Sequence, residues 1–291
     1  MSGARSKREP SQGWPRITIV TPSFNQVQFL ESAILSVLSQ GYPNLEYIVM
    51  DGGSTDNSVD VIRKHEHRIS YWVSEKDEGQ ADAIHRGFER SSGEILGWVN
   101  SDDLLLPDAL LKVGWFFRTH PTVEFATGGC VWIDEQGRVL STGHGLQRYY
   151  PPVTQSRRKL LFWGFGHNQP ATFWRRSAYL EAGGLDASLS FCFDYDLLLK
   201  LAHRKHGAKV PAPLAAYRVH AATKTSTMDA TAQRELQTLR TRYGFEDYNR
   251  FVRLAGSRWY SWAELWQLRV TRMTQALGVL RIPAKIQGPQ S

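Results

Sequence analysis

The chain has 291 residues and a formal net charge of +7, with 42% apolar and 22% charged side chains. This composition is typical of a globular protein and excludes the fibrous and largely disordered classes. No apolar stretch reaches the roughly 18 residues that a membrane-spanning helix needs. Two isolated cysteines, Cys130 and Cys192, are too few for a disulfide framework. The sequence therefore indicates a chain without a membrane span, in a reducing compartment.

The positive charge is concentrated at the two ends. Residues 1–16 carry four basic and one acidic side chain, residues 234–291 carry ten and four, and residues 17–233 carry 21 and 23. A basic chain suggests nucleic acid as a partner, but no nucleic-acid-binding motif accompanies this charge, so we expect none. Residues 1–16 read as a disordered leader that lacks the apolar core of a secretory signal. We therefore expect a cytoplasmic location.

Residues 17–105 begin with short apolar runs, nearly continuous and rich in β-branched side chains. Such runs are typical of strands that are buried on both faces of a parallel sheet, and segments with helical spacing separate them. This alternation predicts a doubly wound sheet of the Rossmann type with helices on both faces. The expected strands are 17–21, 45–51, 69–74 and 94–100, and the expected helices include 29–38, the region of Val59 and Ile62, and 80–90.

The pattern in residues 106–225 is less regular and suggests that the same α/β domain continues as a mixed sheet. Pro107 suits the first position of a helix. The expected helices are 107–119 and 194–203, and the expected short strands are 123–128, 139–141, 171–175 and 208–211.

Acidic residues follow the predicted strands, at the edge where open sheets of this kind bind ligands. Asp51, Asp77, Asp102 and Asp103 all fall there. Two adjacent carboxylates repel each other unless a cation neutralises them, so Asp102 and Asp103 predict a Mg²⁺ or Mn²⁺ site that is completed by phosphate oxygens. For residues 54–56, which immediately precede a helix, we favour the ordinary role of turn and helix cap.

Two common nucleotide motifs are absent from the sequence. No Gly-x-Gly-x-x-Gly follows the first strand, and no Gly-x-x-x-x-Gly-Lys-Ser/Thr loop occurs. Hydride transfer and P-loop hydrolysis are therefore not favoured. A nucleotide held by side-chain acids and a metal ion fits better, and this suits a nucleoside diphosphate as a leaving group.

Several motifs, in order and at matching spacing, resemble those of family 2 glycosyltransferases with the GT-A fold. The resemblance covers residues 17–225 and implies a nucleotide-binding half (17–105), an acceptor and catalytic half (106–225) and a separate helical, basic extension (226–291). The motifs are 17–25 (ITIVTPSFN), 48–56 (IVMDGGSTD), 75–83 (EKDEGQADA), 100–103 (NSDD), 183–186 (GGLD), 193–197 (FDYDL) and 217–220 (YRVH).

The resemblance implies roles for the residues that bind the donor and the metal. Thr21, Asp51 and Asp77 would contact the nucleobase and ribose, and Pro22 would shape their loop. Asn25 and Asp82, within the same motifs, join the expected substrate-binding residues. For a Mn²⁺ or Mg²⁺ cofactor, Asp103 would be the direct ligand, with Asp102 also at the metal and nearer the ribose. His220 would be an additional ligand, although a purely structural role is equally open.

The resemblance also implies the chemistry. Asp194 would be the general base of an inverting transfer from a nucleotide-sugar, a UDP-sugar in our interpretation, to a glycan or lipid-linked saccharide. His167 and Gln169 would lie near the donor sugar. Two positions depart from the family pattern, because Phe193 and Asn100 stand where acids are common. The Gln-x-x-Arg-Trp element of processive synthases is absent, so we do not expect polymer extrusion.

Other functions remain open beside this one. A carbohydrate-binding or nucleotide-binding protein without catalysis would use the same fold, but the acids at 102, 103 and 194 argue against it. A nucleotidyltransferase would need a Gly-rich basic loop after the first strand, which residues 21–25 lack.

Apolar residues in the extension are spaced as on one face of a long helix, with arginines beside them. Such a helix would lie at the inner face of the membrane or pack on its own domain or on a second copy of the chain in a homodimer. The aromatic side chain of Trp163 has the same ambiguity between sugar stacking and core packing. The apolar positions of the extension are Trp259, Trp262, Trp266, Val270, Met273, Leu277 and Leu280.

Overall fold

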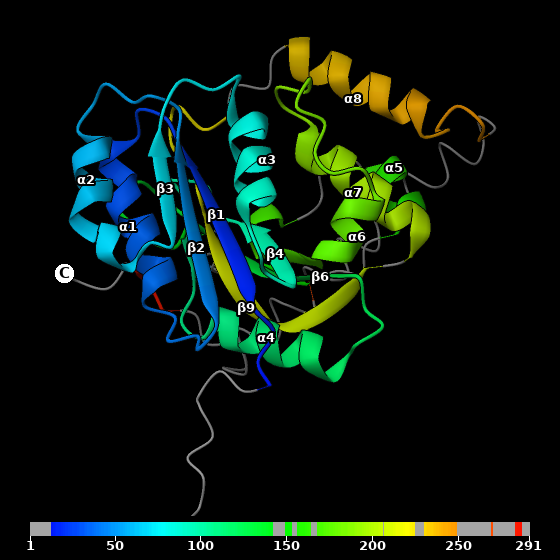
Figure 1. Cartoon of the computed structure of the whole chain (residues 1–291). Coiled ribbons are helices and arrows are strands. Elements are labelled where there is room, and N and C mark those ends of the chain that lie inside the picture. Colours follow the sequence, from blue (N-terminus) through cyan, green and yellow to red (C-terminus); the bar gives the residue numbers. More distant parts are fainter. Residues whose placement is uncertain are drawn as a thin grey trace, which may run out of the picture.

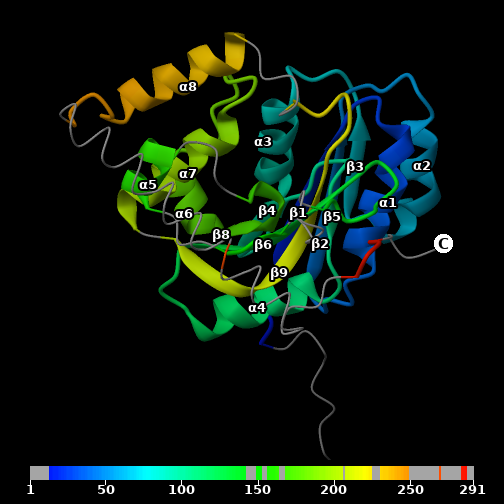
Figure 2. The same cartoon turned by 180° about the vertical axis from the view of Figure 1, so that it is seen from behind.

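The computed structural model describes residues 13–141, 149–152, 156–163, 168–205, 207–224, 230–248, 269 and 283–286. Within these ranges the strands form one nine-stranded mixed sheet in the order β3-β2-β1-β4-β8-β6-β9-β5, and β7 pairs with β6. Helices cover both faces of this curved sheet (Figures 1 and 2). The expected α/β architecture is therefore confirmed.

The first half is the parallel part of the sheet. All seven residues of β1 are buried, as expected for a strand that is covered on both faces. Strands β2 and β3 are added on one side of β1, and β4 pairs with β1 on its other side. The carboxyl ends of β1, β2 and β3 are aligned, because Ser23 is the register partner of Asp51 and Asp51 that of Ser74. These parallel strands are β1 (Ile17–Ser23), β2 (Leu45–Asp51), β3 (Tyr71–Ser74) and β4 (Ile95–Trp98).

Alternate residues of the central strand enter two different hydrophobic clusters. Ile17 and Ile19 pack on the side of α1, α2 and α4, whereas Val20 packs on the side of α3, α6 and α7. This alternation explains why the strand is apolar on both faces. The helices are α1 (Val27–Leu38), α2 (Ser58–His65), α3 (Gln80–Arg90), α4 (Ala109–Thr119), α5 (Arg157–Trp163), α6 (Arg176–Glu181), α7 (Phe193–Arg204) and α8 (Ala230–Arg242), with short 3₁₀ turns η1 (Glu66–Arg68) and η2 (Gln169–Ala171).

The second half adds antiparallel and mixed pairings. Here β8 runs antiparallel to β4 and β6, while β6 and β9 are parallel to each other. A third, smaller apolar cluster forms where β5, β6 and β9 meet. The strands are β5 (Leu104–Leu105), β6 (Phe125–Ile133), β7 (Tyr149–Tyr150), β8 (Thr172–Arg175) and β9 (Ala208–Arg218).

Four predictions for the second half differ from the structure. The strand expected at 123–128 is β6, which continues to Ile133. Strand β9 continues well past residue 211, because Pro213 lies at a register shift opposite Gly129, where the ladder can accommodate a proline. Residues 139–141 form no strand element, since Val139 makes a single bridge with Ile133. Helix α4 begins at Ala109 and not at the proline, because Asp108 adopts a left-handed conformation (φ 61°).

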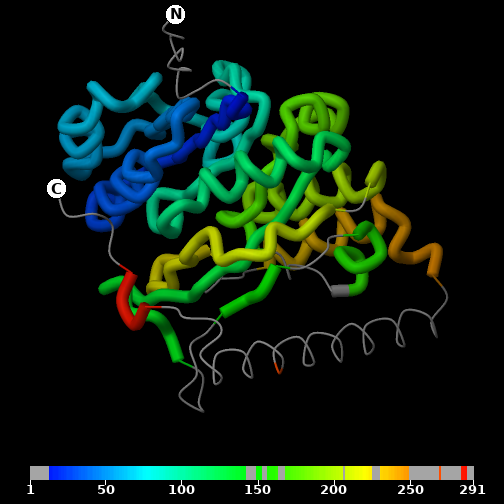
Figure 3. Tube along the Cα trace, turned by 90° about the horizontal axis from the view of Figure 1, so that it is seen from below, coloured from blue at the N-terminus to red at the C-terminus, as the bar shows by residue number. Residues whose placement is uncertain are grey.

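The C-terminal part of the chain is described in two pieces. Helix α8 lies beside α7, and the short segment 283–286 lies beside the turn that follows β6 (Figure 3). There the N–H of Ile286 donates to the carbonyl of Gly137 at 2.8 Å. The seven apolar positions of the predicted stripe, from Trp259 to Leu280, lie outside the described residues. Among the helices that are described, none has the length and apolar character that crossing a bilayer requires.

Candidate active site

A cavity of about 750 Å³ opens at the carboxyl ends of the parallel strands. Each of β1, β2, β3 and β4 contributes residues to its wall at or just after the strand end, which is where open α/β sheets bind ligands. Helix α7 and strands β6 and β9 supply the opposite wall. The strand ends contribute Ser23, Gly52, Asp77, Asn100 and Asp102, and the opposite wall includes Trp132, Phe193, Asp194 and Tyr217.

Asp102 lies on the cavity wall beside His220. The Oδ2 atom of Asp102 is 3.0 Å from Nε2 of His220. The ring of His220 is buried, packs 4.7 Å from the ring of Phe29, and is fixed at its backbone, whose N–H donates to Oγ1 of Thr223 at 2.9 Å. His220 therefore holds the Asp102 carboxylate from behind its contact with the cavity, because Asp102 lines the cavity and His220 is not among the lining residues.

Asp103 is held inside the wall. It is 1% exposed, its Oδ1 accepts the backbone N–H of Arg218 at 3.0 Å, and its Oδ2 accepts the side-chain amide of Asn100 at 3.2 Å. Burial, together with the charge of Asp102, raises the pKa of Asp103 well above its usual range. Of these two adjacent acids, Asp102 lines the cavity, whereas Asp103 is buried behind it.

The donor set fits a hard divalent ion only in part. Among the described residues, no group of three or more His, Cys, Asp or Glu side chains is gathered as a metal site. Mg²⁺ and Mn²⁺ commonly take one or two carboxylates together with phosphate oxygens, and the Asp102 carboxylate meets that requirement. The chemistry of the site therefore fits an ion that binds together with a diphosphate.

Asn100 connects three side chains at the floor of the cavity. Its amide nitrogen donates to Asp103 and to Oε1 of Gln169 at 3.2 Å each, and its Oδ1 accepts from Nε2 of Gln80 at 2.8 Å. Gln169 also donates to the carbonyl of Trp98 at 3.0 Å and lines the cavity. An aspartate at position 100 would lose both donated bonds and face Asp103. The departure from the family pattern at this position thus fits its surroundings.

Asp51 organises the loop after β2. Its Oδ2 accepts the N–H of Ser54 at 2.9 Å and the hydroxyl of Ser74 at 2.7 Å, and its side chain is buried. This arrangement ties the end of β2 to the end of β3. Asp51 therefore shapes the loop whose Gly52 lines the cavity.

The loop after β1 is held in the same manner. Thr21 is fully buried and accepts a hydrogen bond from the Tyr47 hydroxyl at 3.0 Å, whereas Pro22 lines the cavity. Asn25 adopts φ 51°, and its Oδ1 accepts the N–H of Thr55 at 2.8 Å. Of these three predicted contacts, Pro22 is the one on the cavity wall, and the other two fix the loop.

Asp77 faces the cavity at the third strand. Its Oδ1 accepts the N–H of Gly79 at 2.9 Å. Burial raises the pKa of Asp77, and the charges of Asp82 and Asp51 raise it further. A Cβ atom at Gly52 would stand 2.6 Å from Oδ2 of Asp77, so a larger residue there would displace the Asp77 carboxylate.

Asp82 has a local role in the first turn of α3. Its Oδ2 accepts the N–H of Glu78 at 3.1 Å and lies 3.8 Å from Nη1 of Arg86. An acid in this position stabilises the amino end of a helix. Asp82 is thus placed next to the Asp77 loop and adds negative charge to it.

Asp194 lies in the first turn of α7 and lines the cavity. Phe193 precedes it on the same wall, so the residue at the usually acidic position contributes an aromatic surface. Lys224, for which no role was expected, also lines the cavity, and its Nζ donates to the carbonyl of Ser190 at 3.1 Å. Partial burial lowers the pKa of Lys224, against the opposing effect of the Asp194 charge. Its position four residues after His220 was the available signal.

Aromatic side chains from three strands form the wall that sequence reasoning missed. Trp132 stacks on Tyr150 with ring centroids 4.9 Å apart, and it lies 5.4 Å from Tyr217. Trp132 and Tyr217 are register partners on β6 and β9, a pairing that the sequence pattern did not reveal. His167 and the side chain of Trp163 lie outside the described residues.

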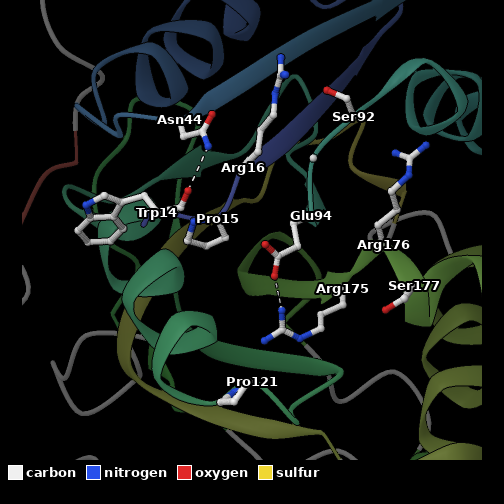
Figure 4. A pocket seen from close by; sticks show the side chains of 11 residues that line it. Trp14, Pro15, Arg16, Asn44, Ser92, Glu94, Pro121, Arg175, Arg176 and Ser177 are labelled. Carbon is white, nitrogen blue, oxygen red and sulfur yellow. Dashed lines mark hydrogen bonds and ion pairs between the residues drawn. The ribbon is translucent and has the colours of Figure 1, made fainter. Parts of the chain in front are cut away.

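A second cavity, of about 620 Å³, lies at the amino ends of the same strands (Figure 4). Two of its arginines are matched by carboxylates: Arg16 lies 3.1 Å from Glu46, and Arg175 lies 2.5 Å from Glu94. At the carboxyl edge, burial and neighbouring acids instead raise the pKa of Asp77 and Asp103. We therefore place the candidate active site at the carboxyl edge.

Known proteins resemble both the sequence and the fold. An uncharacterised glycosyltransferase of Mycobacterium tuberculosis is 30% identical over 190 residues, 65% of this chain and 69% of the relative. Mannosyltransferase PcManGT from Pyrobaculum calidifontis, in complex with GDP-Man and Mn²⁺, superimposes with a TM-score of 0.58 at 16% identity, over 97% of this chain and 81% of that one. S. aureus TarS 1-349, in complex with UDP-GlcNAc, gives 0.56 at 13%, over 84% and 71%.

These likenesses confirm the expected GT-A fold and the enzyme class. The family model described as glycosyl transferase family 2 matches residues 18–184, more than half of the chain and all the strand ends that build the cavity from β1 to β4. The chain belongs to glycosyl transferase family 2.

Proposed function

We propose that the protein transfers a sugar from a nucleoside-diphosphate donor, a UDP-sugar, to a hydroxyl group of a glycan or lipid-linked saccharide, with inversion at the anomeric carbon. One observation carries this proposal. Asp77, Asp102 and Asp194 come from three different elements, the loop after β3, the turn after β4 and helix α7, and line a single cavity at the carboxyl edge of the parallel strands. Because TarS binds UDP-GlcNAc and PcManGT binds GDP-Man, both donors belong in the test.

In this mechanism Asp194 is the general base. Its carboxylate accepts the proton of the acceptor hydroxyl while that oxygen attacks the anomeric carbon. The bond from this carbon to the diphosphate oxygen breaks on the opposite face, and its electron pair leaves with the nucleoside diphosphate. A positioned base typically contributes about 10² to 10⁴-fold to the rate.

The donor would be held by the strand-end loops. Asp77, on the loop after β3, would contact the hydroxyl groups of the nucleoside, and this role is supported by its place on the cavity wall and by the bond of the buried Asp51 to Ser74 at the end of β3. Lys224 also lines the cavity, and its ammonium group would bind a diphosphate oxygen. Asp102, with His220 beside it, would hold a Mn²⁺ or Mg²⁺ ion that neutralises the charge of the leaving diphosphate.

The acceptor would lie against the aromatic wall of Trp132, Tyr150 and Tyr217, since aromatic faces pack well on the apolar faces of sugar rings. These three aromatic residues line the same cavity as Phe193 and Asp194. A free glycan and a lipid-linked saccharide share this sugar chemistry. A lipid-linked acceptor would bring the enzyme to the inner face of the membrane, and the predicted stripe of residues 259–280 remains the candidate for that contact.

A panel of nucleotide-sugars tests the proposal. We expect one donor, with Mn²⁺ or Mg²⁺, to raise the melting temperature and to release its nucleoside diphosphate when a saccharide acceptor is present. The Asp194→Asn variant should show the same thermal shift without the release. A donor that binds but is never turned over by the unmodified protein would favour the alternative, a binding protein without catalysis.

A further inference from the structure

A carboxylate from the C-terminal extension caps the amino end of the helix that carries Asp194. Glu235, on α8, accepts three consecutive backbone N–H groups: Oε1 accepts that of Ser190 at 2.8 Å, and Oε2 accepts those of Phe191 at 3.0 Å and Cys192 at 2.8 Å. These three residues immediately precede the first residue of α7. One side chain thus fixes the whole segment by which the chain enters this helix.

The amino end of α7 depends on this external partner. Cys192, at the N-cap position, makes no side-chain capping bond of its own. The three N–H groups that Glu235 accepts lie just before the first turn of α7, where a negative charge is favourable. Asp194 is only two residues beyond Cys192, so any shift of the entering segment moves its carboxylate within the cavity.

Helix α8 is also anchored at a second place, away from this segment. Leu239 is fully buried, and the hydroxyl of Tyr243 donates to Oδ1 of Asp196 at 2.8 Å. The two helices lie side by side in both views (Figures 1 and 2). Because these contacts remain when Glu235 is changed, seating of α8 and capping of α7 can be tested separately.

We propose that Glu235 is a positioning residue that sets the place of the general base, which makes the extension after residue 225 part of the catalytic unit. This inference rests on the proposed role of Asp194. Glu235 lies beyond the family match at residues 18–184 and beyond the motifs that end at His220. The residue acts through the backbone of 190–192 and does not touch the cavity wall that holds the donor.

The test compares two variants that each disturb the contact between α8 and α7. Glu235→Gln keeps the side-chain volume but turns an amide toward backbone donors, whereas Tyr243→Phe removes a hydrogen bond at the other anchor. We expect Glu235→Gln to lower kcat about tenfold or more, since displacements near 1 Å can cost about 10²-fold, while the Kd of the nucleoside diphosphate changes less than threefold. Tyr243→Phe should lower the melting temperature and leave kcat unchanged.

Other outcomes would overturn the proposal. If both variants lower the melting temperature and neither lowers kcat, α8 only stabilises the domain. If both lower kcat equally, general loosening explains the effect and a specific role of Glu235 fails. Should Glu235→Gln not fold, Glu235→Asp, whose carboxylate has a shorter reach, carries the same expectation. The Asp194→Asn variant, measured in the same assay, separates the two proposals. Full activity of Asp194→Asn refutes the role of Asp194 as the base. If Asp194→Asn is inactive and Glu235→Gln has a normal kcat, only the positioning role of Glu235 is refuted.

Discussion

The two ends of the parallel strands hold carboxylates in opposite settings. At the amino end, Glu46 accepts hydrogen bonds from the hydroxyl of Thr18 and from the N–H and hydroxyl of Ser92, and it pairs with Arg16 at 3.1 Å. Burial opposes the ionisation of Glu46, but these partners outweigh burial and hold its pKa below the usual range. This end of the sheet is electrostatically satisfied.

At the carboxyl end, the hydrogen bonds of Asp77 and Asp103 do not outweigh the burial of their carboxyl groups. Burial and neighbouring acids raise the pKa of both Asp77 and Asp103. The folded protein therefore holds these side chains at a cost when they are ionised, as expected where a site is prepared for a ligand rather than for stability. The difference teaches that acids at one end of the sheet stabilise the fold, and acids at the other end are available to a cation, a nucleotide and a proton.

The largest effect that we expect is on turnover. Replacing Asp194 with Asn removes the proton acceptor, and kcat should fall by about 10² to 10⁴-fold. Donor affinity, measured by calorimetry, should stay within a factor of about three because the strand-end loops are untouched. Near-normal kcat would show that another group accepts the proton.

The next effect concerns metal-dependent binding. Asp102→Asn should weaken nucleoside-diphosphate binding in the presence of Mn²⁺ by about 10 to 100-fold, the range seen when groups at a metal site are altered. Binding without the metal should change much less. Equal Mn²⁺ dependence in the variant and the unmodified protein would contradict the role of Asp102.

A substitution at the amino end should affect stability and not turnover. Glu46→Gln disturbs a buried, charge-assisted network and should lower the free energy of unfolding by about 1–3 kcal/mol, with kcat unchanged. A lowered pKa in the folded state stabilises the protein above the usual value of 4.5, and this part is lost as the pH falls toward the folded value. The variant should therefore lose less stability than the unmodified protein between neutral pH and that range. A lower kcat in a Glu46→Gln variant that is fully folded would contradict the view that acids at the amino end serve stability alone.

The smallest expected effect has the opposite sign. Because the pKa of Asp77 is raised in the folded state, its contribution to stability is present at low pH and is lost as the pH rises through the folded value. Asp77→Asn should thus raise the melting temperature slightly at neutral pH while weakening nucleoside binding. Asp60→Asn, which removes an exposed first-turn acid of α2, is the matched control: it should leave nucleoside binding unchanged and lower the melting temperature slightly. A clear loss of stability in Asp77→Asn would contradict the contrast.

The parallel half of the fold could be predicted because its strands are short, apolar and separated by helical periods. The same pattern placed Asp77 and Asp102 at one edge, since parallel strands end together. Asp51 and Thr21 were placed at the right edge of the sheet, but their side chains are engaged elsewhere, that of Asp51 by the loop after β2 and that of Thr21 by Tyr47 on the neighbouring strand. The residue at a strand end is predictable from a sequence, whereas the direction of its side chain depends on neighbours from other strands.

The second half could be predicted only in outline. Trp132 meets Tyr217 through the pairing of β6 with β9, two strands separated by more than 70 residues and interrupted by a proline at a register shift. Glu235 reaches α7 from a helix that no motif covers. Contacts of this kind depend on tertiary pairing, which local periodicity does not encode.

A crystal structure with a nucleoside diphosphate and Mn²⁺ tests the contrast between the two ends most directly. We predict density for the nucleotide in the cavity at the carboxyl end, with its ribose near Asp77 and its diphosphate near Asp102 and Lys224. Nucleotide density in the arginine-lined cavity at the amino end, beside Arg16 and Arg175, with the carboxyl-end cavity holding none, would contradict it.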